Sequence, residues 1–311
     1  MGHYIRLLRP ADWVKNTFVF AALLFGRQLQ NLDAVVLSIM AFVAFCLASS
    51  AGYVFNDILD RNRDRLHPTK KDRPLASGAM SVQSAGAMIG VLVILCVLVC
   101  RLWLPPAFWL TVGAYVALTW TYSLALKHRM LLDVIVIAIL FVLRAIGGAE
   151  AIGVVVSPWL LICTFMLCLF LGFGKRRCEV AMIDNTHAMR GHRRTLVRYT
   201  PDLLTHLLST SAGVTIITFL LYTLDTTWKS PFEATKQNLI YTLPLVVYGV
   251  YRFAMLIELG KGTGPTDLIL KDPAFLSAVV LWVLSAAAIL YLLPEHWHFG
   301  LAPPSLTTAP G

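Results

Sequence analysis

Charged residues are scarce in this chain. They make up 14% of the 311 residues, whereas hydrophobic residues make up 58%. A soluble domain carries roughly 25% charged residues, so most of this chain cannot face water. The apolar runs are near 20 residues long and do not alternate with polar residues, which favours helices over a β-barrel. The composition therefore predicts an all-α integral membrane protein.

Cysteine motifs, a cleavable leader and broken-helix repeats are also missing. All of the six cysteines except Cys178 fall inside expected helices, and Cys178 is expected in a loop on the reducing side, so no disulfide or metal framework is indicated. The first apolar segment lacks a small-residue cleavage site, so we expect it to be retained. The lack of inverted repeats with Gly- or Pro-broken helices argues against a transporter.

About nine transmembrane helices are expected in a single domain over residues 1–301. The predicted spans are 14–29, 33–55, 83–103, 106–125, 131–151, 157–174, 203–224, 237–257 and 273–293. The Pro-rich end, 302–311, is predicted to be a disordered tail.

The basic residues give the expected orientation. Most of the 26 Lys and Arg residues fall on one side if the N-terminus is cytoplasmic. The positive-inside rule therefore predicts a cytoplasmic N-terminus, an external C-terminus and insertion in the inner (cytoplasmic) membrane. The net charge of +9 is then explained by the topology of a chain whose partners include membrane lipids, and it needs no nucleic acid as a partner.

Four oxygen-bearing side chains follow the second apolar run: Asn56, Asp57, Asp60 and Asp64. On a helix these spacings place all four on one stripe. Like charges at this spacing repel, and a bound cation would relieve the repulsion. Mg²⁺ prefers such hard oxygen ligands and often bridges carboxylates to substrate phosphates. The alternative is a solvated helix end whose acids pair with the neighbouring arginines, Arg61, Arg63 and Arg65.

A proline-framed basic loop comes next, His67-Pro68-Thr69-Lys70-Lys71-Asp72-Arg73-Pro74. The prolines stop the helix, so Lys70 and Arg73 can turn back toward the acidic stripe. A metal beside cations suggests a diphosphate ligand.

These motifs resemble the UbiA superfamily of intramembrane prenyltransferases. The Asn-Asp-x-x-Asp-x-x-x-Asp stripe, Arg73-Pro74 and Ser77-Gly78 carry the resemblance. The opening run 9–16, which contains Lys15 and Asn16, and the run 67–74 are most similar to the polyprenyl-phosphate phosphoribosyltransferase branch. The resemblance implies helices around a central cavity, and substrate contacts by Lys15 and Asn16. Members of that branch move phosphoribose from phosphoribosyl pyrophosphate to decaprenyl phosphate.

The fourth predicted helix ends in Tyr122-Ser123-Leu124-Ala125-Leu126-Lys127, and Asp133 starts the fifth. This run resembles the superfamily's Tyr-Ser-x-x-Leu-Lys element, whose lysine contacts phosphate. The alternatives are an interfacial tyrosine, a lysine anchor and an aspartate that complements the helix dipole.

Arg144 follows Asp133 by eleven residues, which places both on nearly the same helix face and Arg144 some 16 Å deeper. An arginine there costs roughly 2.5–3.5 kcal/mol on insertion scales, so it needs a partner from another helix or a ligand. We expect Arg144 to face the same cavity as Asp133, although a structural salt bridge is the alternative.

A basic segment follows the sixth predicted helix, with Lys175, Arg176, Arg177 and Glu179. Aromatic prenyltransferases of the superfamily usually place a second Asp-x-x-x-Asp motif here, but the only acids between 175 and 200 are Glu179 and Asp184. Cations suit an acceptor that brings its own phosphate, and membrane anchoring is the simpler explanation for Arg190, Arg193 and Arg194.

The sequence thus predicts an Mg²⁺-dependent membrane phosphoribosyltransferase. Its partners are phosphoribosyl pyrophosphate and a polyprenyl phosphate, and a homo-oligomer is compatible with the sequence. We expect Asp57, Asp60, Lys127 and Lys175 to be catalytic. The rivals are an aromatic prenyltransferase that uses a prenyl diphosphate and an anion transporter.

Overall fold

A computed structural model describes residues 2–66, 70–186, 198–225, 233–260 and 272–293. Every regular element in these ranges is a helix, which confirms the all-α prediction. The elements are α1 (Gly2–Leu8), η1 (Pro10–Phe20), α2 (Ala21–Phe25), α3 (Leu32–Asp64), α4 (Val82–Trp103), α5 (Pro106–Leu124), η2 (Leu126–His128), α6 (Leu132–Ile152), α7 (Pro158–Thr186), α8 (Pro201–Leu224), α9 (Glu233–Lys236), η4 (Gln237–Thr242), α10 (Leu243–Glu258) and α12 (Pro273–Leu292). The predicted tail, 302–311, lies outside these ranges.

The helices have the length and the surface of membrane spans. Seven of those described are long and apolar enough to cross a bilayer, and α5, with 19 residues, is a further long helix outside that set. Large apolar side chains such as Ile94 and Leu102 of α4, and Leu284 of α12, are exposed. This exposure is expected of helices that face lipid.

The first predicted span differs from the prediction. Instead of an α-helix over 14–29, the chain forms the 3₁₀ helix η1 followed by the short α2. A 3₁₀ helix rises about 2 Å per residue, so the two together reach about 30 Å, the thickness of the hydrocarbon layer. η1 also packs on α6, because a side chain at Gly148 would meet the carbonyl oxygen of Val19 at 1.9 Å.

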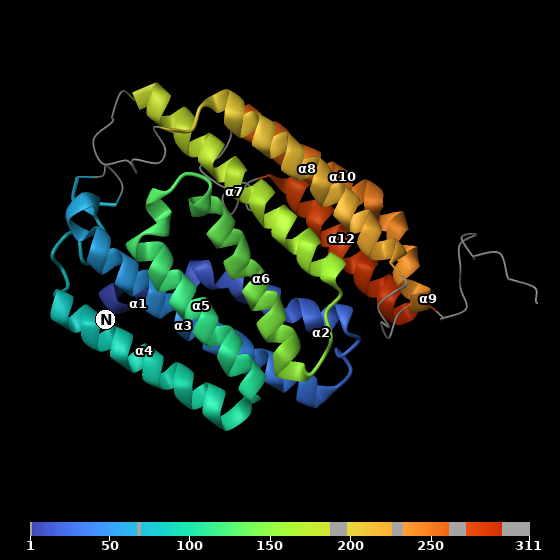
Figure 1. Ribbon diagram of the computed structural model, residues 1–311, viewed down its shortest axis with the longest axis horizontal. Coiled ribbons are helices and arrows are strands. Elements are labelled where there is room, and N and C mark those ends of the chain that lie inside the picture. Colours follow the sequence, from blue (N-terminus) through green and yellow to red (C-terminus); the bar gives the residue numbers. More distant parts are fainter. Residues whose placement is uncertain (1, 67–69, 187–197, 226–232, 261–271, 294–311) are drawn as a thin grey trace, which may run out of the picture.

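Two helices are much longer than a bilayer requires. α3 has 33 residues and α7 has 29, so they extend about 50 and 44 Å against about 30 Å of hydrocarbon. Their C-terminal ends point the same way, toward the upper left of Figure 1. The prediction that the sixth helix ends at 174 is therefore wrong. Lys, Arg and Glu are good helix formers, so the end of the apolar run is not the end of the helix.

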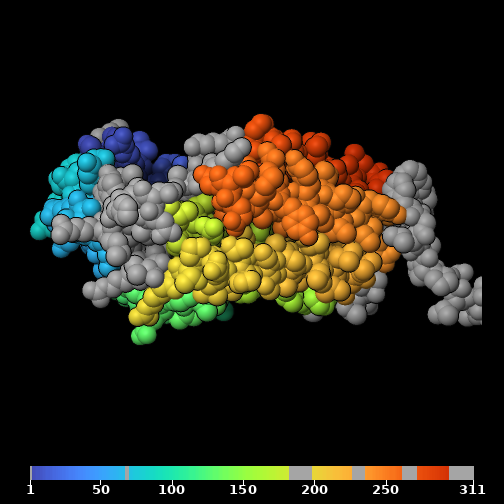
Figure 2. Space-filling model, turned by 90° about the horizontal axis from the view of Figure 1, so that it is seen from above, coloured from blue at the N-terminus to red at the C-terminus, as the bar shows by residue number. Residues whose placement is uncertain are grey.

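The molecule has two sets of helices that meet at α6. The N-terminal set comprises η1 and α2 to α5, and the C-terminal set comprises α7, α8, α10 and α12 (Figure 1). α6 packs against η1 and α5 on one side and against α7 on the other. α10 lies between α8 and α12 on the face shown in Figure 2.

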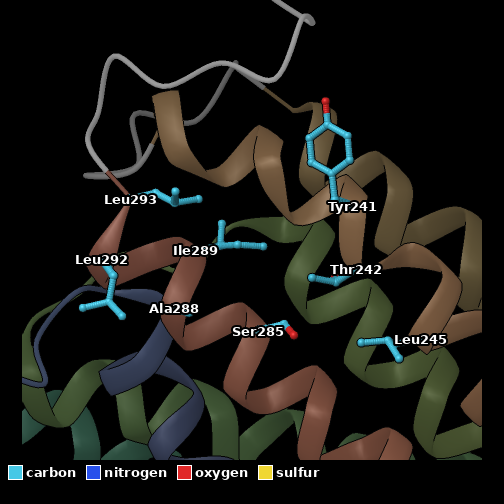
Figure 3. Close-up of a pocket in the computed structure, with 8 residues that line it drawn as sticks. All are labelled: Tyr241, Thr242, Leu245, Ser285, Ala288, Ile289, Leu292 and Leu293. Carbon is cyan, nitrogen blue, oxygen red and sulfur yellow. The ribbon is translucent and has the colours of Figure 1, made fainter.

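An apolar cavity of about 540 Å³ lies where α10 begins and α12 ends. Tyr241, Thr242 and Leu245 line it from one side, and Ser285 and Ile289 from the other (Figure 3). Since the opposite ends of α10 and α12 carry Glu258 and Asp272, this cavity is remote from the charged ends of α3 and α7.

Candidate active site

The acidic stripe forms on the last turns of α3, as predicted. Asn56, Asp57, Asp60 and Asp64 all belong to this one continuous helix. Asp57 is only 3% exposed and Asp64 only 4%, although both are charged. Buried carboxylates require partners, and the stripe has them.

Two arginines neutralise one side of the stripe. Arg9 Nη2 donates to Asp57 Oδ1 at 2.5 Å, and Arg73 Nη1 donates to Asp57 Oδ1 at 3.0 Å and to Asp64 Oδ2 at 2.7 Å. The predicted return of Arg73 toward the stripe is thus confirmed, and Lys70 is half-buried in the same turn. Burial opposes the charge of Arg9, but the attraction and the hydrogen bond of Asp57 outweigh it and raise the pKa of Arg9.

Arg9 is a site residue that sequence reasoning missed. It precedes η1 with φ 53°, a left-handed conformation that non-glycine residues rarely adopt. Its guanidinium also lies 5.1 Å from the ring centre of Tyr53, one turn before Asp57 on α3. The sequence offered one signal, the position of Arg9 in the opening motif, but a motif does not show which residue the arginine contacts.

Lys127 closes the other side of the stripe. Its Nζ donates to Asn56 Oδ1 at 3.0 Å and to Asp60 Oδ1 at 2.8 Å, and the residue is 1% exposed. The short helix η2 between α5 and α6 presents this lysine. The end of α5 therefore belongs to the same site as the end of α3.

The neighbouring arginines do not satisfy the acids. Arg61 Nε donates to the carbonyl of Leu75 and Arg65 Nε to that of Ala76. Of these three arginines, only Arg63 lies within 4 Å of an acid in the described ranges, with Nη1 3.8 Å from Asp60 Oδ1. The alternative interpretation was that these three arginines neutralise the acids of the stripe. One loose ion pair, between Arg63 and Asp60, supports it.

The donor chemistry of the stripe suits Mg²⁺, because every ligand is a hard carboxylate or amide oxygen. Among the described residues, no three His, Cys, Asp or Glu side chains are grouped closely enough to hold a metal ion. Instead, Arg73 Nη1 and Lys127 Nζ each bind two oxygens of the stripe. The site therefore holds positive charge between its oxygens already.

A second charged cluster lies where α7 passes the start of α6. Arg176 Nε is 2.8 Å from Asp133 Oδ2, and Arg176 Nη1 also donates to Glu179. Arg176 is 3% exposed and Asp133 is fully buried. The predicted Tyr122 of α5 is partly buried and packs against the apolar core of the N-terminal helices.

Tyr199 completes this cluster and was also missed. Its hydroxyl donates to Asp133 Oδ1 at 2.7 Å and accepts the N–H of Leu131 at 2.8 Å. Leu131 has φ 67°, a strained conformation that this hydrogen bond supports. Burial and the hydrogen bond to Asp133 raise the pKa of Tyr199, so its hydroxyl stays protonated.

The basic residues of α7 do not form one surface. Lys175 is exposed, Arg176 is buried, and Arg177 Nη2 lies 3.4 Å from Glu258 Oε2 of α10. Successive residues on a helix point about 100° apart, so three in a row cannot face one phosphate. The expectation that Lys175, Arg176 and Arg177 form one cluster in a loop is therefore wrong, because all three belong to α7 and point in different directions. Cys178, expected in that loop, is instead buried in α7.

Arg144 lies in a third cluster, in which its hydrogen-bond partners are uncharged. Its Nε donates to Asn16 Oδ1 and its Nη2 to the Tyr115 hydroxyl, both at 2.7 Å, and its Nη1 donates to the Leu140 carbonyl. We predicted a partner from another helix or a ligand, and two other helices supply one each, Asn16 of η1 and Tyr115 of α5. Asp133 contacts α7 and Tyr199 instead, so the two side chains have different hydrogen-bond partners among the described residues.

The remaining predicted residues have partners outside the stripe. Lys15 pairs with Asp12 at 2.5 Å, and the buried amide of Asn16 donates to Cys46 and Ser49. The hydroxyl of Ser123 donates to the carbonyl of Thr119 within α5.

Comparison with known proteins agrees with this arrangement. The sequence pattern of the UbiA prenyltransferase family matches residues 16–279. The chain belongs to the UbiA prenyltransferase family. It is 31% identical over 293 residues to decaprenyl-phosphate phosphoribosyltransferase of Corynebacterium glutamicum, covering 93% of this chain and 87% of that protein. It is 30% identical over 302 residues to the enzyme of the same name from Mycolicibacterium smegmatis, covering 92% of each.

The UbiA fold is also evident in solved structures. A UbiA homologue from Archaeoglobus fulgidus, bound to GPP and Mg²⁺, aligns with a TM-score of 0.68 and 20% identity. The alignment covers 93% of this chain and 99% of that one. The predicted resemblance to the family is therefore confirmed over nearly the whole length.

Proposed function

We propose that this UbiA-family protein transfers 5-phosphoribose from phosphoribosyl pyrophosphate to a polyprenyl phosphate of the decaprenyl type. An oxygen of the lipid phosphate attacks C1 of the ribose, the bond from C1 to the pyrophosphate breaks, and pyrophosphate leaves. The observation that carries the proposal is the identity of 30–31% to two decaprenyl-phosphate phosphoribosyltransferases over more than 90% of this chain.

The acidic end of α3 is assigned to the diphosphate. Asn56, Asp57, Asp60 and Asp64 would hold Mg²⁺, which when bound offsets the negative charge of the departing pyrophosphate. The family's solved relative with GPP and Mg²⁺ supports a divalent metal in this fold. Arg73 and Lys127, which border the stripe, would bind the phosphate oxygens and orient the donor.

The end of α7 is assigned to the acceptor. A lipid phosphate is already ionised, so it needs positive charge and no strong general base. Arg177 and Lys175 lie nearest to the surface there, and Arg176 with Asp133, Glu179 and Tyr199 fixes the position of the helix end. The lack of a second Asp-x-x-x-Asp motif between 175 and 200 supports an acceptor phosphate at this end.

We further propose that both charged ends lie on the cytoplasmic side of the inner membrane. The positive-inside distribution supports this orientation, which places the C-terminus outside. Phosphoribosyl pyrophosphate is water-soluble, so it would reach α3 from the cytoplasm while the prenyl chain stays in lipid.

The test is product analysis. Protein purified in detergent is incubated with Mg²⁺, radiolabelled phosphoribosyl pyrophosphate and a polyprenyl phosphate, and the lipid product is analysed. We expect a phosphoribosylated lipid that requires all three components. Consumption of a prenyl diphosphate and an aromatic acid, without use of phosphoribosyl pyrophosphate, would instead establish the aromatic prenyltransferase function.

A further inference from the structure

We infer that Arg9, Arg73 and Lys127 are exchangeable counter-ions of the acidic stripe, which pass from the stripe to the donor diphosphate when Mg²⁺ binds. This inference assigns Arg9 as a further diphosphate-binding residue, and it predicts that metal and diphosphate bind cooperatively. It rests on the proposed function only in requiring a diphosphate, the group that phosphoribosyl and prenyl donors share.

The first support is that the cations and the acids of the stripe share hydrogen-bonding atoms. Asp57 Oδ1 accepts from both Arg9 and Arg73, and Arg73 Nη1 serves both Asp57 and Asp64. Lys127 Nζ likewise lies between Asn56 and Asp60. Arg73 and Lys127 thus each lie between two oxygens that a metal ion would bind, and Arg9 binds one of these oxygens. Among the described residues, the three acids pair with Arg9, Arg73 and Lys127, and the looser Arg63 lies at the rim.

The second support is the cost of binding either ligand alone. Mg²⁺ alone must displace the cations, and this leaves Arg73 and Lys127 without their carboxylate partners. A diphosphate alone must draw the same cations away, and this leaves the buried Asp57 and Asp64 as unpaired charges. Breaking an ion pair of buried groups by removing one partner is strongly unfavourable. When metal and diphosphate bind together, every charge keeps a partner.

The third support is the placement of Arg9. Its left-handed backbone (φ 53°) and its contact with the ring of Tyr53 direct the guanidinium at Asp57. Strained backbone conformations persist where the surrounding structure enforces them, and they are frequent at ligand sites. Arg9 and Arg73 are 23% and 27% exposed, so both guanidinium groups can also contact a ligand that enters from solvent.

The experiment is calorimetric titration of the full-length protein in detergent. Mg²⁺ and inorganic pyrophosphate are titrated separately and then each in the presence of the other, with free concentrations corrected for the complex they form in buffer. We expect each to tighten the binding of the other by about tenfold or more, within the usual range of coupling between sites. Independent binding in the wild type would overturn the inference.

Two variants sharpen the test by the sign of their effects. Arg9→Gln and Arg73→Gln should each strengthen binding of Mg²⁺ alone, because a carboxylate is released, and weaken binding of pyrophosphate in the presence of Mg²⁺. Arg252→Gln is the matched control, because it removes an arginine that pairs with Asp272, away from the stripe.

If Arg9→Gln does not fold, Arg73→Gln and the wild-type coupling decide the outcome. Weaker Mg²⁺ binding in the variants would overturn the inference, whereas intact coupling without use of phosphoribosyl pyrophosphate would overturn only the proposed function.

Discussion

The charged ends of α3 and α7 are built in opposite ways. At the end of α3 the helix supplies the acids, and Arg9, Arg73 and Lys127 come from outside the helix. At the end of α7 the helix supplies Arg176 and Arg177, and the acids Asp133 and Glu258 come from α6 and α10. One end therefore presents carboxylates that a metal can take, and the other presents cations that a phosphate can use.

The two ends also differ in how firmly their ion pairs are fixed. Arg9 and Arg73 are each about a quarter exposed, whereas the side chain of Arg176 is 4% exposed and that of its partner Asp133 is fully buried. Pairs that solvent reaches can exchange partners during a reaction. The carboxylate of Asp133 has no exposed surface, so Arg176 fixes α7 against α6, whereas Asp60, the partner of the buried Lys127, is still 13% exposed.

The largest effect is expected from the acids of α3. Asp57→Asn or Asp60→Asn should abolish turnover while the protein remains folded in detergent, because each variant removes a charge assigned to the metal. Asp72→Asn, in the adjoining loop, should be mild. EDTA should stop the reaction and added Mg²⁺ should restore it. Equal activity in the three variants would leave the stripe with a structural role only.

The buried pair at the end of α7 is expected to control stability. Arg176→Ala leaves Asp133 as a buried, uncompensated charge, so the free energy of unfolding should fall by about 3–5 kcal/mol. Arg177→Ala breaks a pair whose acid is 45% exposed and should lose about 1 kcal/mol or less. Chemical denaturation in detergent measures both. Similar losses in the two variants would contradict the distinction between fixed and accessible pairs.

A smaller effect is expected from Tyr199→Phe. The change removes a hydrogen bond to the ionised Asp133 and the acceptor for the Leu131 N–H, and bonds to charged groups contribute about 1.5–3 kcal/mol. Stability should fall by that amount, and Tyr248→Phe, on the exposed face of α10, is the control. A variant as stable as the wild type would show that Tyr199 does not support the turn before α6.

The smallest effect is expected from Arg63→Gln at the rim of the stripe. Its 3.8 Å pair with Asp60 is loose and the arginine side chain is 38% exposed, so stability should change by less than about 1 kcal/mol. Stability and kcat/KM measured beside Arg73→Gln would show whether the inner cations differ from the outer one. If Arg63→Gln lowered stability and kcat/KM as much as Arg73→Gln does, the distinction between inner and outer cations would be contradicted.

The features that could be predicted from sequence are those set by local spacing. The stripe on α3 follows from helical periodicity, and the turn of Arg73 back to it follows from the prolines that frame the loop. The contacts that were missed join distant segments: Arg9 to Asp57 across 48 residues, Tyr199 to Asp133 across 66 and Lys127 to Asp60 across 67. No periodicity reports such contacts, because they depend on how the helices pack.

The errors in helix bounds have a similar physical origin. Hydropathy marks where lipid ends, and α7 continues well beyond that point as a polar helix. The first span was placed four residues too late, because η1 already begins at Pro10, among the polar residues that precede the apolar run. Apolar length therefore locates the membrane and does not locate the ends of the helices.

The most direct test of the account is whether the two charged ends serve different substrates. Steady-state KM values for phosphoribosyl pyrophosphate and for a polyprenyl phosphate are measured in Arg73→Gln and Arg177→Ala, with Arg252→Gln as the control. A charge-assisted contact to phosphate contributes about 1.5–3 kcal/mol, so one substitution should change kcat/KM by about tenfold or more. We predict that Arg73→Gln raises the KM for phosphoribosyl pyrophosphate and Arg177→Ala that for the lipid phosphate. A rise in the same KM in both variants would contradict the assignment of α3 to the donor and α7 to the acceptor.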